Sequence, residues 1–197
     1  MQSQSAAQPS LQESAARAFG IAIGNLFLGC FGMAWIVLGL NSAQKLTPLV
    51  LALLSCFLLA LVIASVYILQ RTHGSLDRSQ ANRAAQKKIN RQFGWVNLLQ
   101  WSLIFGAVYG LPYLGLTRWI VPAIVLIVGI HFFPLASVFK ARQHYVIGAI
   151  VVAWAIVYPI LFSAGKDDST GAVGIGAILW ASAAFASWRV FHLLHSY

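Results

Sequence analysis

Six apolar stretches, each long enough to cross a lipid bilayer, contain none of the chain's four acidic residues. A membrane-spanning helix needs about 20 apolar residues to cover a hydrocarbon core about 30 Å thick. The runs over 49–69 and 119–139 carry no polar stripe at the 3.6-residue spacing of an amphipathic surface helix. The sequence therefore predicts an all-α, polytopic membrane protein with spans at 18–40, 46–69, 95–116, 119–139, 144–162 and 173–194.

The composition agrees with a membrane protein. Charged residues make up 9% of the chain, against about 25% in ordinary soluble domains. The six spans and their short links use nearly all of the 197 residues. Residues 1–197 are therefore predicted to form a single membrane domain, a bundle of six transmembrane helices.

The distribution of lysine and arginine predicts the orientation. Ten of the thirteen lie on the side of the membrane that holds both termini. Basic residues are enriched in cytoplasmic loops, so both termini and the basic loop 70–94 are predicted to be cytoplasmic. The net charge of +9 then reflects membrane topology and does not indicate a nucleic-acid partner.

The basic loop contains a further helical pattern over residues 76–93. Its apolar residues recur at i, i+4 spacing, and cations fill much of the remaining surface: Arg78, Arg83, Lys87, Lys88 and Arg91. Such a helix can lie at the membrane interface with its cations on anionic lipid headgroups. Two alternatives stay open: a solvated segment that only sets topology, and a contact with the acidic surface of a partner.

One ionisable side chain, His131, is predicted near the centre of the bilayer. It lies twelve residues past the start of the fourth span, about 18 Å down at 1.5 Å per residue. Pro134 follows three residues later and frees the carbonyl of Ile130, so the two features together predict a small polar pocket. Asn25, Gln100 and Ser102 are placed at a similar depth and are the predicted partners. The alternative is a neutral histidine that hydrogen-bonds inside the bundle.

No other histidine is predicted at the level of His131. His144 and His192 both fall near the cytoplasmic face, so a pair of imidazoles around a haem is unsupported. The sequence holds no H-E-x-x-H, G-x-S-x-G, P-loop or C-x-x-C motif and no paired carboxylates. It therefore predicts no catalytic residue, no metal site and no cofactor.

Small residues and cysteines mark expected helix contacts. Four pairs at i, i+4 predict close packing, either within the chain or between subunits: Gly20 with Gly24, Ala149 with Ala153, Ala177 with Ala181, and Ala183 with Ser187. Gly29 and Gly32 continue the small surface of the first span. Cys30 and Cys56 lie equally far from the first outer turn and could touch, but thiols in mid-membrane are expected to stay free.

The segment Gly129-Ile130-His131-Phe132-Phe133-Pro134-Leu135-Ala136 resembles a segment of a group of uncharacterised six-span bacterial inner-membrane proteins. The resemblance covers this one helix, and its specific part is histidine, two aromatic residues and proline. It implies a multi-pass protein of the bacterial cytoplasmic membrane and a joint importance of His131 and Pro134. It carries over no activity.

Two functions remain compatible with the sequence. The first is a non-catalytic membrane component, a subunit or an assembly or regulatory factor whose helices pack on another membrane protein or on a second copy. The second is a small-solute transporter or channel whose pathway passes His131 and Pro134, since kinked helices with midplane polar groups are common in transporters. The low number of polar residues at membrane depth favours the first.

Overall fold

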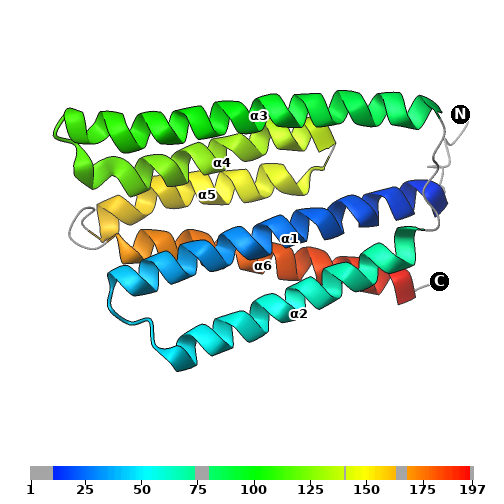
Figure 1. Cartoon of the computed structure of the whole chain (residues 1–197), viewed down its shortest axis with the longest axis horizontal. Helices are drawn as coiled ribbons and strands as arrows, with labels where there is room; N and C mark the ends of the chain where they lie inside the picture. The colour runs from blue at the N-terminus through cyan, green and yellow to red at the C-terminus, as the bar shows by residue number, and fades with distance from the viewer. Residues whose placement is uncertain (1–10, 74–79, 140, 163–167, 196–197) are drawn as a thin grey trace, which may run out of the picture.

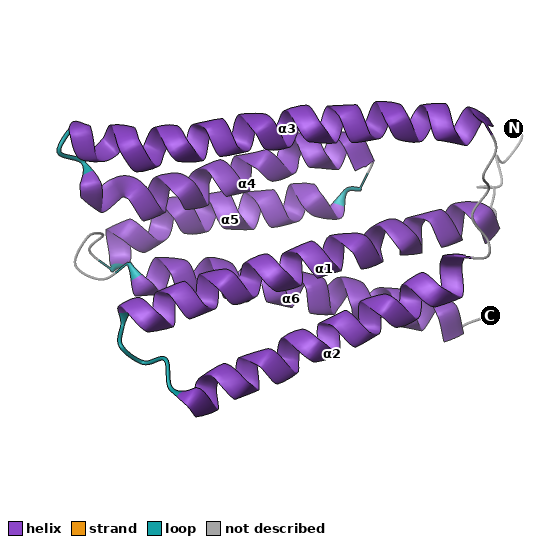
Figure 2. Cartoon of the chain, viewed as in Figure 1, coloured by secondary structure: helices purple, strands orange, loops and turns teal. Residues whose placement is uncertain are grey.

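The computed structural model describes the backbone over residues 11–73, 80–139, 141–162 and 168–195, and the side chains of 18–72, 87–139, 141–162 and 168–192. All the regular structure in these ranges is helical, as predicted (Figure 2). The elements are α1 (Leu11–Ser42), α2 (Pro48–His73), α3 (Gln80–Tyr113), the short 3₁₀ helix η1 (Thr117–Trp119), α4 (Ile120–Phe139), α5 (Gln143–Leu161) and α6 (Ser169–His195).

Helix ends follow from local chemistry. At the start of α2, the Thr47 hydroxyl accepts a hydrogen bond of 3.2 Å from the backbone N–H of Val50, and Pro48 occupies the first helical position. At the end of α3, Gly115 adopts φ +71°, and Leu116 N–H donates to the Leu111 carbonyl at 2.8 Å. This is the bonding of a Schellman cap, which favours glycine at the left-handed position.

Five of the described helices are long and apolar enough to cross a membrane: α1, α2, α4 with η1, α5 and α6. They coincide with five of the six predicted spans. The third predicted span, 95–116, is helical over most of its length, but α3 is not among those five. Polar residues such as Asn97 and Gln100 interrupt its apolar run.

The expectation of a separate interfacial helix over 76–93 is wrong. From Gln80 onward this segment belongs to α3, which continues without a break to Tyr113 and has 34 residues. At 1.5 Å per residue α3 is about 51 Å long, more than a bilayer is thick. A single glycine, Gly94, is too weak a breaker to end a helix. Figure 1 shows α3 extending well past the α4–α5 link.

The helices lie side by side with their long axes roughly aligned, and both chain termini are at the same end (Figure 1). Contacts place them in the order α2, α1, α6, α5, α4, α3, with α6 touching both α1 and α5. Among the described helices, α3 contacts only α4 and η1. Helices α2 and α3 are neighbours in sequence, yet they occupy the two opposite edges of the bundle.

Glycines bring the central helices together. A Cβ at Gly176 on α6 would lie 2.7 Å from the carbonyl oxygen of Gly32 on α1, and a Cβ at Gly148 on α5 would lie 2.9 Å from the carbonyl of Gly129 on α4. The indole N–H of Trp180 donates to the Gly29 carbonyl at 2.8 Å across the α1–α6 contact. Close backbone approach of this kind provides the dispersion contacts that hold helices together in lipid.

Among the predicted small residues, Gly32, Ala183 and Ser187 lie in contacts within this chain, because a Cβ at Gly32 would meet Trp180 and the other two are buried. The other three pairs make no such contact. A Cβ at Gly20 or Gly24 would meet nothing within 4 Å. The pairs Ala149 with Ala153 and Ala177 with Ala181 are exposed. Cys30 and Cys56 are free thiols, as expected, and both are exposed.

Candidate functional site

His131 lies near the middle of α4, eleven residues after Ile120. Its imidazole is half-buried and lies close to the backbone of Val96 on α3. The side chain therefore faces α3, the one helix that packs on the outer face of α4. The polar pocket and its alternative, a histidine hydrogen-bonded inside the bundle, both stay predictions.

Two of the predicted partners of His131 lie elsewhere. The Asn25 side chain on α1 donates a buried hydrogen bond of 2.8 Å to the Ser187 hydroxyl on α6, and α1 makes no contact with α4 among the described residues. Ser102 is exposed and bonds the Leu98 carbonyl of its own helix at 2.9 Å. Gln100 lies one helical turn beyond Val96 on α3 and is half-buried. Pro134 is inside α4 and exposed.

A second histidine, His144, shares an aromatic neighbour with His131. His144 lies on the first turn of α5, nearer the end of the bundle than His131, and both rings lie beside Phe132. The His144 ring centroid lies 6.1 Å from that of Phe132 and 6.2 Å from that of Phe139. We call His131, Phe132, Phe139 and His144 the histidine cluster. α5 begins at Gln143 and packs along α4, which brings His144 to this place.

The histidine cluster lies where α3, α4 and α5 meet. Phe93 of α3 closes one side, with its ring centroid 5.7 Å from that of Phe139. The Nδ1 atom of His144 is buried and has no hydrogen-bond partner in the part of the chain that the structure describes. Within that part, no three histidine, cysteine or acidic side chains gather into a group suited to a metal ion. The cluster is thus two imidazoles in an aromatic setting.

A second polar site joins α1, α2 and α6. The Asn25–Ser187 hydrogen bond is one part of it. The other is Ser65 on α2, which is fully buried and whose hydroxyl has no hydrogen-bond partner among the described residues. Ser65 and Asn25 are each twenty residues from Lys45 in the α1–α2 link, so they lie at one depth in antiparallel helices. The apolar residues Ala22, Ile68 and Val190 pack together on one side of this level.

The Asn25–Ser187 bond is expected to stabilise the bundle by a modest amount. Hydrogen bonds between membrane helices average about 0.6 kcal/mol and reach about 1.7 kcal/mol. In a double-mutant cycle with Asn25→Leu and Ser187→Ala, measured as free energies of unfolding in micelles, we expect a coupling energy in that range. Ser102→Ala, which removes an exposed hydroxyl, is the control and should have no effect. Strictly additive effects of the two core substitutions would contradict the assignment.

The predicted headgroup contacts are described in part. Lys87, Lys88 and Arg91 are exposed on the first half of α3. Arg78 lies outside the described residues, and the side chain of Arg83 does as well. These three cations thus lie on the edge helix α3, in the half that is nearer the end of the bundle with both termini (Figure 1).

No protein-family model, curated protein or solved structure matches this chain. Its class therefore follows from its own helices. Five helices long and apolar enough to span a bilayer, packed with aligned axes, define a multi-pass membrane protein. The resemblance of the 129–136 segment to bacterial inner-membrane proteins stays a prediction.

Proposed function

We propose that this chain is a non-catalytic component of the bacterial inner membrane, with six membrane-crossing helices and both termini in the cytoplasm. The sixth crossing is α3, which lies alongside α4 and connects to it through a tight turn at Gly115. The excess of basic residues at the end that holds both termini supports the orientation. The proposed role is to bind a membrane helix of another protein, or of a second copy, along α3.

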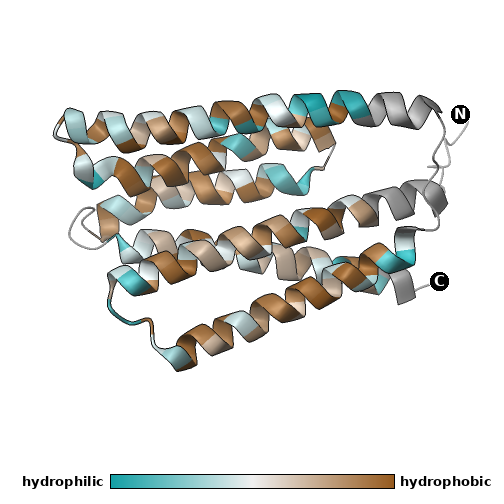
Figure 3. Ribbon diagram, in the orientation of Figure 1, coloured by the Kyte–Doolittle hydropathy of each residue, from teal (hydrophilic) through white to brown (hydrophobic). Residues whose placement is uncertain are grey.

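The observation that carries this proposal is the contrast between the two edge helices. α2 is the most apolar of the five candidate spans, and Figure 3 shows it brown over most of its length. That suits a helix surrounded by lipid. α3 also occupies an edge, but Figure 3 shows its brown residues interspersed with pale and teal ones, the strongest teal lying in its first half. Polar side chains inside an apolar run, such as Asn97 and Gln100, are better covered by protein than by lipid tails.

A pair of glycines on α3 with no helix packed against them also supports a partner along this helix. A Cβ at Gly106 or Gly110 would meet nothing within 4 Å, although these two residues form a GxxxG pattern. Gly32, Gly129 and Gly176 are each packed against a neighbouring helix, whereas Gly20 and Gly24 on α1 form a second GxxxG pattern with nothing within 4 Å. Lipid gives no hydrophobic drive for helix association, so an unfilled GxxxG on a polar edge helix favours a helical partner.

Photo-crosslinking from the two edges tests this proposal. Benzoylphenylalanine replaces Phe105 on α3, which is 55% exposed, and as a matched control it replaces Leu59 on α2, which is 57% exposed. We expect a discrete protein adduct from position 105 and lipid adducts alone from position 59. Equal lipid labelling at both positions, with no protein adduct, would contradict a partner on α3.

The number of crossings has its own test. If α3 crosses the membrane, alkaline phosphatase fused after residue 116 is outside and active, and a fluorescent protein fused there is dark. A fluorescent protein at the C-terminus should fluoresce. The reverse result after residue 116 would leave α3 on the cytoplasmic side.

The alternative is a small-solute transporter or channel that passes His131 and Pro134. The proximity of His131 to the Val96 backbone on α3 supports a packing role for this histidine in our proposal. We expect His131→Ala to lower the amount of folded protein in the membrane and His131→Gln, which retains a hydrogen-bond donor, to restore most of it. A normal amount of folded protein for both variants would favour a pathway.

A further inference from the structure

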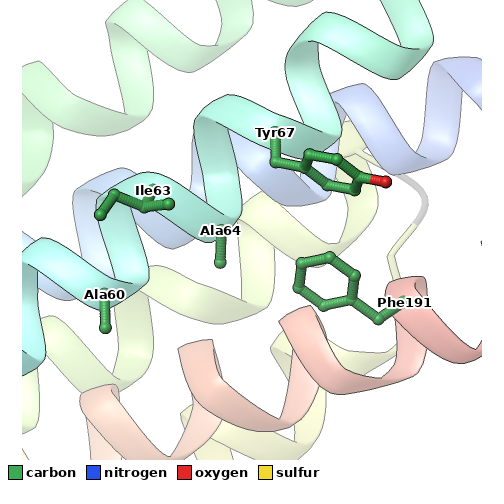
Figure 4. Close-up of a pocket in the computed structure, with 5 residues that line it drawn as sticks. All are labelled: Ala60, Ile63, Ala64, Tyr67 and Phe191. Atoms are coloured by element: carbon green, nitrogen blue, oxygen red, sulfur yellow. The ribbon is translucent and has the colours of Figure 1, made fainter.

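An apolar groove of about 500 Å³ opens between α2 and α6, on the side of the bundle away from α3. Figure 4 shows its lining: Ala60, Ile63, Ala64 and Tyr67 from α2, and Phe191 from α6. The four α2 residues recur at i, i+3, i+4 and i+7, so they form one stripe along the helix. Two alanines in this stripe leave the hollow, which larger side chains would fill.

One end of the groove is aromatic and cationic. The rings of Tyr67 and Phe191 stack with their centroids 5.7 Å apart, and they face each other in Figure 4. The Arg71 guanidinium lies 5.4 Å from the Tyr67 ring centroid, one helical turn further along α2. Arg71 is exposed. Among the described side chains it meets no carboxylate, because Asp168, the one acid among them, lies at the opposite end of the bundle.

The groove and Arg71 together cover the depth of one leaflet. The groove lining on α2 runs from Ala60 to Tyr67, about 10 Å along the helix axis, and Arg71 lies beyond it, about 16 Å from Ala60. Half of the hydrocarbon core is about 15 Å thick. Ala60 is at the middle of the candidate span Pro48–Thr72, so Arg71 is at the level where a headgroup would be.

We propose that this groove binds one anionic glycerophospholipid of the leaflet on the side that holds both termini. An acyl chain lies along Ala60 and Ala64, and the lipid phosphate contacts Arg71. An open apolar groove and, one helical turn beyond it, a guanidinium without a described counter-ion match the two parts of such a lipid. The proposal requires α2 and α6 to lie in the membrane and does not depend on a partner at α3.

The test uses the full chain in phosphatidylcholine vesicles that contain a small fraction of phosphatidylglycerol with a diazirine on its acyl chain. After irradiation, labelled peptides are mapped by mass spectrometry. We expect the 60–71 segment to be labelled more strongly than the exposed face of α5, and unlabelled phosphatidylglycerol to compete better than phosphatidylcholine.

Two variants separate the headgroup from the acyl chain. Arg71→Gln should lower groove labelling by the phosphatidylglycerol probe about fivefold, the effect of roughly one basic residue at a membrane surface, and leave labelling by a phosphatidylcholine probe unchanged. Ala64→Leu should lower labelling by both probes, whereas Ala153→Leu on the exposed face of α5 should lower neither. Equal labelling of the groove by both probes, unaffected by Arg71→Gln, would show ordinary annular lipid and overturn the proposal.

Discussion

Replacing Gly176 with alanine is expected to lower the free energy of unfolding by about 3 kcal/mol, the upper part of the range for overpacking a close contact. The added methyl group would lie 2.7 Å from the Gly32 carbonyl oxygen and 2.6 Å from a side-chain carbon of Ile36. Both partners belong to α1, so the two helices that make the most extensive contact in the bundle must move apart. The free energy is measured by denaturant titration in micelles with helix content as the signal.

Gly106→Ala is the matched control for that experiment. Gly106 is also inside a helix, but a Cβ there meets nothing within 4 Å. Alanine is the better helix former, so this variant should be unchanged or slightly more stable. A loss of the same size in both variants would mean that glycine flexibility matters, and that the α1–α6 approach does not.

The second large effect concerns the partner that we propose for α3. Replacing Gly106 and Gly110 together with leucine should lower partner recovery at least about tenfold, equivalent to roughly 1.4 kcal/mol. Leucine side chains on this pair would keep the backbone of a second helix at a distance. The measurement is the ratio of partner to tagged chain after gentle extraction.

The same substitution on another exposed small-residue pair is the control. Ala149 and Ala153 are both exposed on α5, so leucine at these positions changes the surface to a similar degree. Partner recovery should stay normal for the variant with leucine at Ala149 and Ala153. The variant with leucine at Gly106 and Gly110 should still fold when it has lost its partner. Full recovery with both leucines in α3 would place the contact elsewhere.

Apolar length predicted the helices well, because a span must satisfy its own backbone hydrogen bonds in lipid. Helix continuity was harder to predict. The 76–93 pattern and the third span each looked like a complete unit. The structure carries one helix through both, since α3 contains no proline before Pro112.

Contacts between helices were the least predictable part. Counting residues from a turn gives the depth of Asn25 and of His131, but it does not give which neighbour each helix faces. Because α1 packs between α2 and α6, Asn25 meets Ser187 and not the histidine. The same holds for glycines. Spacing marked Gly20, Gly24 and Gly32 on the first span alike, but of these three only Gly32 packs against another helix, and its partner Gly176 was not predicted.

Native mass spectrometry of the gently extracted chain tests the central claim most directly, that α3 carries a partner in the membrane. We predict a stoichiometric complex with a second membrane protein or a second copy, which dissociates when Gly106 and Gly110 are replaced with leucine. A monomer that carries lipid alone, with and without these substitutions, would contradict the proposed function.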